Sequence, residues 1–157
     1  MKIVLMVVLI SSFSYLGFQI GGLFAAKEKF YSELIGFITH LISEISFLKT
    51  DLMGISTNFK STNKHFNLFL DNLKNKILFE KDYENITILN EQENLEIKNF
   101  INSLGKNDAL NECEIIKSFL ENFKLKLNDS REGNKKYGIM YKKLGVLVGI
   151  LVCIVLI

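Results

Sequence analysis

The sequence predicts an all-α protein, in which a small antiparallel helical bundle is flanked by an N-terminal transmembrane helix and a short C-terminal apolar membrane anchor. Three observations support this fold class: long uncharged runs at both ends, apolar residues at helical spacing between them, and the absence of proline from all 157 residues. Proline interrupts helix interiors, so a chain without it favours long helices. We therefore divide the chain into residues 1–26, 27–143 and 144–157.

The N-terminal segment is an uncharged stretch of 24 residues, 3–26. This length is sufficient to cross the hydrocarbon core of a bilayer, which is ~30 Å thick. The alternative is a cleaved signal peptide, whose apolar region usually has about 7 to 15 residues and ends in small residues before the cut. Leu23 and Phe24 do not suit such a site, so we predict a transmembrane helix.

The C-terminal segment, residues 144–157, is apolar but shorter. Fourteen helical residues at ~1.5 Å each cover only ~21 Å. Tyr137 and Tyr141 can lie at the level of the lipid headgroups, and Lys142 and Lys143 can extend toward them. We interpret the segment as a short terminal anchor, with an apolar helix buried in protein as the alternative.

Four apolar stripes at helical spacing lie between these segments, and they predict helices over residues 28–50 and 63–80 and two further helices after them. The stripes are Leu34, Ile38, Leu41, Ile45, Leu48 and Leu52; Phe66, Phe69, Leu70, Leu73 and Ile77; Ile86, Leu89, Ile97, Phe100, Ile101 and Leu104; and Cys113, Ile116, Leu120, Phe123 and Leu127. Each stripe must be buried against another, which predicts a bundle. After Leu127 the polar run "NDSREGNKK" leads the last helix toward the membrane, with Gly133 and Gly138 favouring a bend.

Both membrane segments contain a GxxxG pattern, Gly17 with Gly21 and Gly145 with Gly149. Small residues at this spacing allow two helices to approach closely in a membrane. We expect the two segments to pair antiparallel, with Gly21 and Gly149 at similar depths.

Basic residues gather beside both membrane segments. Lys27 and Lys29 follow the first segment, and the larger group before the tail comprises Arg131, Lys135, Lys136, Lys142 and Lys143. By the positive-inside rule this predicts that the bundle faces the cytosol. The domain itself is close to neutral, which argues against nucleic-acid binding.

We find no catalytic pattern and expect no enzyme activity, cofactor or metal. His40 and Glu44 are one helical turn apart, but two such residues are usually an ordinary ion pair rather than metal ligands. "SLGKND" (residues 103–108) lacks the spacing of a phosphate-binding loop, and its Gly105 suits the end of a helix. Cys113 and Cys153 are too far apart in the predicted topology to suggest a disulfide.

Several local segments carry a family resemblance. They are Gly17-Phe18 late in the first span, "EISFLKTDL" at residues 44–52, "SLGKND", and above all "YGIMYKKLGVLVGILVCIVLI" at residues 137–157. In these segments and in the order of its parts, the chain resembles the stage III sporulation protein AB family of endospore-forming bacteria. The matched segments make Glu44, Thr50, Leu52, Gly105 and Asp108 candidate partner contacts.

The resemblance implies a membrane component of the complex built between mother cell and forespore, with a domain similar in fold to the cytosolic domains of the type II secretion platform protein F. It implies partners from the same sporulation operon, including a secretion-type ATPase, stage III sporulation protein AA. We therefore expect a non-enzymatic platform protein of a secretion-like channel, in the mother-cell membrane around the forespore. The alternative is a membrane-tethered helical sensor or chaperone that binds a cytosolic client. Expression confined to engulfment favours the first, and constitutive expression favours the second.

Overall fold

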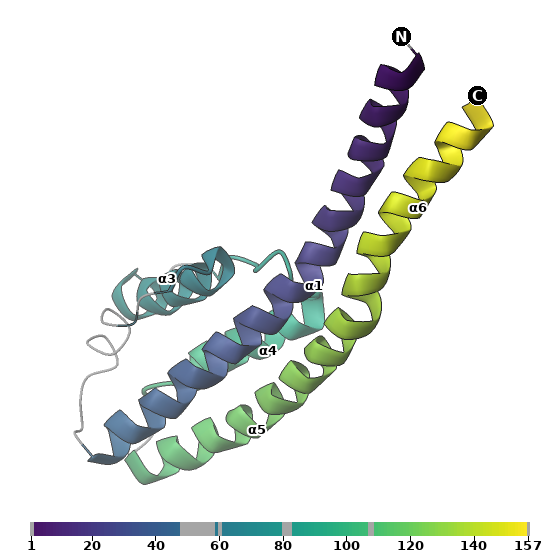
Figure 1. The fold of residues 1–157 in the computed structure, drawn as a ribbon. Coiled ribbons are helices and arrows are strands. Elements are labelled where there is room, and N and C mark those ends of the chain that lie inside the picture. The colour runs from purple at the N-terminus through teal and green to yellow at the C-terminus, as the bar shows by residue number, and fades with distance from the viewer. Residues whose placement is uncertain (1, 48–58, 60, 80–82, 107–108, 157) are drawn as a thin grey trace. The chain divides into compact units, whose positions relative to one another are not determined.

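The computed structural model describes residues 2–47, 59, 61–79, 83–106 and 109–156. Every regular element within these ranges is helical, which confirms the predicted all-α class (Figure 1). The elements are α1 (Lys2–Phe47), α3 (Lys64–Phe79), α4 (Glu91–Ser103), α5 (Ala109–Gly133), the π-helical turn η1 (Asn134–Gly138) and α6 (Ile139–Leu156).

The chain divides into two compact units. The central unit is Lys29–Leu127, and the terminal unit combines Met1–Glu28 with Asn128–Ile157. Helices α1 and α5 contribute residues to both units. Residues 128–143, which we assigned to the bundle from the sequence, cluster with the terminal unit.

Apolar side chains of α1, α3, α4 and α5 form the core of the central unit. Leucine and isoleucine make up most of it, and phenylalanine rings contact one another within it. The ring of Phe100 lies 5.6 Å from that of Phe123 and 6.5 Å from that of Phe69, measured between centroids. Such edge-to-face and stacked pairs add to the free energy gained from burying the rings. The aromatic contacts therefore connect α3, α4 and α5 across one continuous core.

The first two predicted stripes are largely the buried faces of their helices. Leu34, Ile38 and Leu41 are fully buried, and Ile45 is half-buried at the edge of the core. Leu48 and Leu52 lie outside the described residues. The prediction that Ile77 is buried is wrong. Its side chain is 40% exposed, because the core contacts of α3 end one turn earlier, at Leu73.

The third stripe is only partly helical. Ile86 and Leu89 are buried as predicted, but they belong to an irregular segment, and α4 begins only at Glu91. The helix starts there because the side chain of Asn90 accepts from the backbone N–H of Glu93, while the Glu93 carboxylate accepts from the backbone N–H of Asn90. This reciprocal capping box fixes a helix N-terminus.

The buried amide of Asn94 holds the irregular segment in place. Its oxygen accepts from the backbone N–H of Ile86 at 2.8 Å, and its nitrogen donates to the carbonyl oxygens of Ile86, Leu89 and Asn90 at 3.1 to 3.2 Å. One side chain thus replaces the hydrogen bonds that a helix would have supplied to this backbone.

In the terminal unit, α1 and α6 lie side by side and antiparallel, and both chain termini lie at the same end (Figure 1). The chain from α5 to α6 stays helical through Gly133 and Gly138. The π-helical turn occupies the place where a bend was expected, and the N–H of Ile139 donates to the carbonyl of Asn134, five residues back. A π turn inserts one extra residue into a helix.

Candidate functional site

Glycines make the closest contact between α1 and α6. A methyl group built on Gly17 would lie 2.9 Å from the Cα atom of Gly145 and 2.7 Å from the carbonyl oxygen of Tyr141. A methyl group on Gly145 would meet the carbonyl oxygen of Phe13 at 2.7 Å. Contacts this short leave no space for a side chain, so the two backbones pack directly on each other.

The predicted equal depth of Gly21 and Gly149 is wrong. Gly21 faces Gly138 and the stem of Lys142, whereas Gly149 faces Ile10 and Phe13, more than two turns of α1 away. The helices are aligned by Gly17 against Gly145. Sequence spacing could not fix this alignment, because two GxxxG patterns can be matched in several registers.

Gly138 is a contact residue that we missed in the sequence. A methyl group on Gly21 would lie 2.6 Å from its carbonyl oxygen, and one on Gly138 would lie 2.5 Å from the side-chain oxygen of Asn134. The signal was present: Gly138 stands seven residues, or two helical turns, before Gly145. From the sequence, Gly138 was expected only to favour a bend.

A polar clamp at the end of this contact was also missed. Asn134, in the π-helical turn, donates from its side-chain nitrogen to the Glu28 carboxylate at 2.8 Å. The guanidinium Nε of Arg131 lies 3.6 Å from the other carboxylate oxygen. Because Glu28 belongs to α1 and the other two to the second chain segment, the clamp joins the two halves of the terminal unit.

Most of the predicted membrane-surface residues are exposed. Lys135, Lys136 and Lys143 point to solvent, and Arg131 does so while also contacting Glu28. Lys142 is half-buried, with its stem over Gly21 and its ammonium 5.9 Å from the ring centroid of Phe18.

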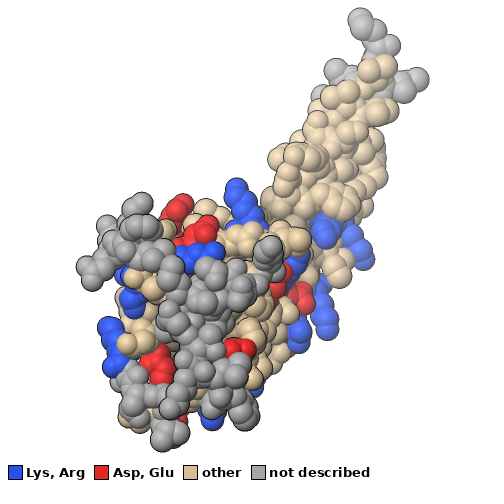
Figure 2. All heavy atoms as spheres, turned by 90° about the vertical axis from the view of Figure 1, so that its left-hand side faces the viewer, with Lys and Arg blue, Asp and Glu red and all other residues tan. Residues whose placement is uncertain are grey.

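The basic side chains gather at one end of the terminal unit. On the face shown in Figure 2, the stretch of this unit toward the chain termini carries no coloured charge on its described atoms. Phe24 packs on Tyr137 and Tyr141 with centroids 6.1 and 6.0 Å apart. An aromatic group therefore lies close in sequence to the basic one, as is common at a membrane interface.

Much of the outer surface of the paired helices is apolar. Val8, Leu147 and Val155 are 58%, 64% and 76% exposed. Apolar patches of this kind on two adjacent helices indicate contact with a membrane or another protein. Two segments, Met6–Ile45 and Asn111–Val155, contain windows that are long and apolar enough to cross a membrane, with mean hydropathies of 1.6 and 2.0.

Of the five candidate partner contacts, Glu44 and Gly105 lie within the described residues. Glu44 is half-buried, and one of its carboxylate oxygens lies 3.9 Å from His40 Nε2. Gly105 follows the end of α4 with φ of 77°, and its N–H donates to the Glu112 carboxylate at 2.6 Å. Thr50, Leu52 and Asp108 lie outside the described residues, so their role stays a prediction.

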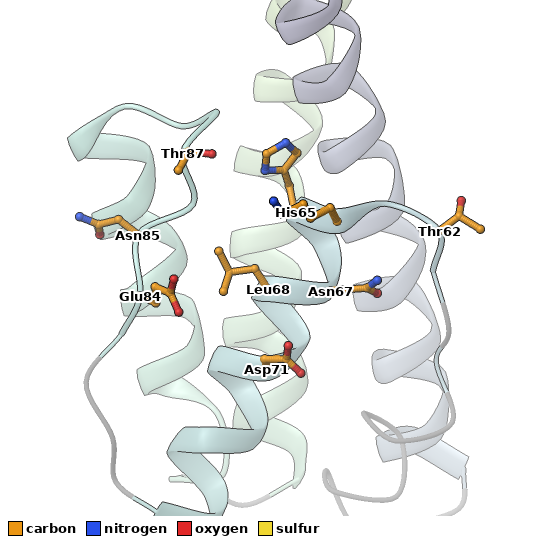
Figure 3. A pocket seen from close by; sticks show the side chains of 9 residues that line it. Thr62, His65, Asn67, Leu68, Asp71, Glu84, Asn85 and Thr87 are labelled. Atoms are coloured by element: carbon orange, nitrogen blue, oxygen red, sulfur yellow. The ribbon is translucent and has the colours of Figure 1, made fainter.

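One open polar pocket lies between the start of α3 and residues 84–87 (Figure 3). His65, Asp71 and Glu84 line it, and partial burial together with the neighbouring Lys64 lowers the pKa of His65. Across the described ranges, no three His, Cys, Asp or Glu side chains gather as a metal ion would require. Figure 3 shows the two carboxylates projecting from different elements.

The fold and the glycine contact define a class: an all-α protein with a helical core and two paired apolar helices of membrane-spanning length. The chain belongs to the stage III sporulation protein AB family, whose family model matches residues 2–157. Its role is therefore connected with sporulation. A search of curated proteins gave no match, and a search of solved structures gave none either.

Proposed function

We propose that this chain is a non-enzymatic platform protein of the channel complex between mother cell and forespore. The observation that carries the proposal is the pair of apolar helices packed through Gly17 and Gly145, with the basic residues at one end of the pair. Together with family membership, this supports a protein anchored in the membrane at both ends of its chain.

The proposed orientation places the central unit in the cytosol of the mother cell. Basic residues flanking membrane segments favour the cytosolic side. Each lysine or arginine near an anionic leaflet contributes about 1 kcal/mol of attraction. In this orientation the central unit can meet a secretion-type ATPase, for which we propose stage III sporulation protein AA.

The non-enzymatic character is supported by the surroundings of Lys106. The N–H of Gly105, which would have to face a phosphate, donates instead to the Glu112 carboxylate. A carboxylate at this position repels an anionic ligand. We expect no ATP hydrolysis by the purified chain; turnover that disappears in Lys106→Ala would contradict this part of the proposal.

The proposal is tested by purifying the tagged full chain from sporulating cells in mild detergent. The ATPase should co-purify with the wild-type chain and with Val146→Leu, whose site is partly exposed on α6. Gly145→Leu should lose spore formation, because the new side chain cannot fit against Gly17. A wild-type chain that supports sporulation but never retains the ATPase would favour a tethered sensor or chaperone instead.

A further inference from the structure

Helix α1 carries a second contact face that α6 does not use. Ser11, Ser12, Tyr15 and Gln19 are all exposed, and we call them the polar stripe. Tyr15 and Gln19 each stand two residues before Gly17 and Gly21. At about 100° per residue this places them about 200° round the helix, on the side away from α6.

The polar stripe is out of place on a helix surrounded by lipid. The two serine hydroxyls donate to carbonyl oxygens of their own helix, Ser11 to Val7 at 2.7 Å and Ser12 to Val8 at 2.8 Å. These hydrogen bonds lower the free-energy cost of placing the hydroxyls in lipid. Gln19 is different, because its amide has two N–H groups and an oxygen with two lone pairs. The bond from its nitrogen to the Tyr15 hydroxyl, at 2.5 Å, engages one of these groups. Polar side chains within a membrane normally face protein rather than lipid.

We propose that the polar stripe binds the polar stripe of a second copy of this chain, forming a parallel α1–α1 pair in the membrane. This rests on the proposed placement of α1 across the bilayer. Two copies in one membrane share an orientation, so a two-fold axis along the membrane normal brings each residue close to the same residue of the other copy. The contact must therefore be self-complementary.

The chemistry of the stripe meets that requirement. Amides and hydroxyls both donate and accept, so Gln19 can pair with Gln19 of the second copy and Tyr15 can pair likewise. A charged or purely accepting side chain could not pair with itself. Gly22 continues the same face, and a methyl group built there would meet nothing within 4 Å, which leaves space for a neighbouring backbone.

Helix α6 is a poorer candidate for the same role. Its described side chains beyond Lys143 are apolar apart from Cys153, and the Cys153 thiol is directed at the carbonyl of Met6, 3.5 Å away. The hydrogen-bonding capacity of the paired helices is thus concentrated on the outer face of α1.

The test uses cysteine cross-linking of the full chain in membranes of a host that makes no sporulation proteins. Both native cysteines are first changed to serine. Tyr15→Cys then places a thiol on the stripe, and Leu16→Cys places one at the same depth but about 100° away. The two positions are comparably exposed, at 63% and 55%. Oxidation should give a disulfide-linked dimer from Tyr15→Cys and little from Leu16→Cys.

A second variant tests whether Gln19 holds the dimer together. Adding Gln19→Leu should weaken dimerisation about tenfold, as expected for losing an interhelical amide pair, while adding Ile20→Leu should leave it unchanged. Equal cross-linking from positions 15 and 16, none from either, or a Tyr15→Cys adduct to another protein would overturn the proposal.

Carbonate extraction of the membranes distinguishes failure of this proposal from failure of the proposed function. A chain released from the membranes would overturn both, whereas a retained chain without the dimer would overturn the self-association alone.

Discussion

Single buried polar residues decide the local structure of the central unit. Asn72 exchanges two hydrogen bonds with the backbone of Glu84, at 2.8 and 2.9 Å, and so attaches the irregular segment to α3. Burial, followed by the nearby Glu93 carboxylate, raises the pKa of Tyr31 well above its usual value. Tyr31 therefore stays neutral throughout the physiological range, and its interaction with Glu93 remains intact.

Leu41 is the residue at which core packing is tested most directly. Its side chain is fully buried in the core of the central unit, so Leu41→Ala leaves a cavity and should lower the free energy of unfolding by about 2 to 5 kcal/mol. Denaturation of the full chain in detergent micelles, followed by near-ultraviolet circular dichroism, measures the change. Ser43→Ala, at an exposed position of the same helix, is the control. A loss of less than about 0.5 kcal/mol for Leu41→Ala would show that the first apolar stripe is not packed in the core.

At the scale of elements, the pairing of α1 with α6 depends on which glycines meet. Substituting Gly17 with alanine places a methyl group against the backbone of α6, whereas Gly22→Ala places one in open space. We expect Gly17→Ala to separate the helices and Gly22→Ala to leave them paired.

A disulfide between Met6→Cys and the native Cys153 reports this pairing, since the Cys153 sulfur lies 3.5 Å from the Met6 carbonyl. Cys113→Ser removes the competing thiol, and a protease site inserted after the exposed Lys106 shows whether the two halves stay linked. Linkage that survives equally in Gly17→Ala and Gly22→Ala would contradict the glycine contact.

The elements were more predictable than their contacts. The 3.6-residue period of apolar side chains identified Leu34, Ile38 and Leu41 as core without any structure, because burial of one helix face imposes that period. The same period predicted burial correctly at Ile86 and Leu89 but predicted a helix there wrongly. Burial of apolar side chains carries no information about the Asn94 amide, which replaces the helical hydrogen bonds. The Glu28 clamp was not predictable either, because it joins residues more than 100 positions apart.

At the scale of the whole molecule, the proposed cytosolic orientation makes a testable prediction. Lys98→Cys, in a background without the native cysteines, places a thiol at an exposed position of α4. A membrane-impermeant thiol reagent should label it only after cell lysis, because seven basic residues flank the membrane segments on the side of the central unit. Labelling in intact cells would place the central unit outside the cytosol and remove the ATPase as a direct partner.

The π-helical turn at Asn134–Gly138 holds one residue more than an ordinary α-helical stretch would need at this place. Deleting Lys136, which is exposed, should convert the turn to ordinary α-helix and leave Gly145 and Gly149 facing α1. Deleting one residue from the regular helix between Gly138 and Gly145 would instead rotate every later residue by about 100° and turn both glycines away from α1. During evolution, the loss of a single codon should therefore be accepted within this turn far more readily than in the regular helix that follows it.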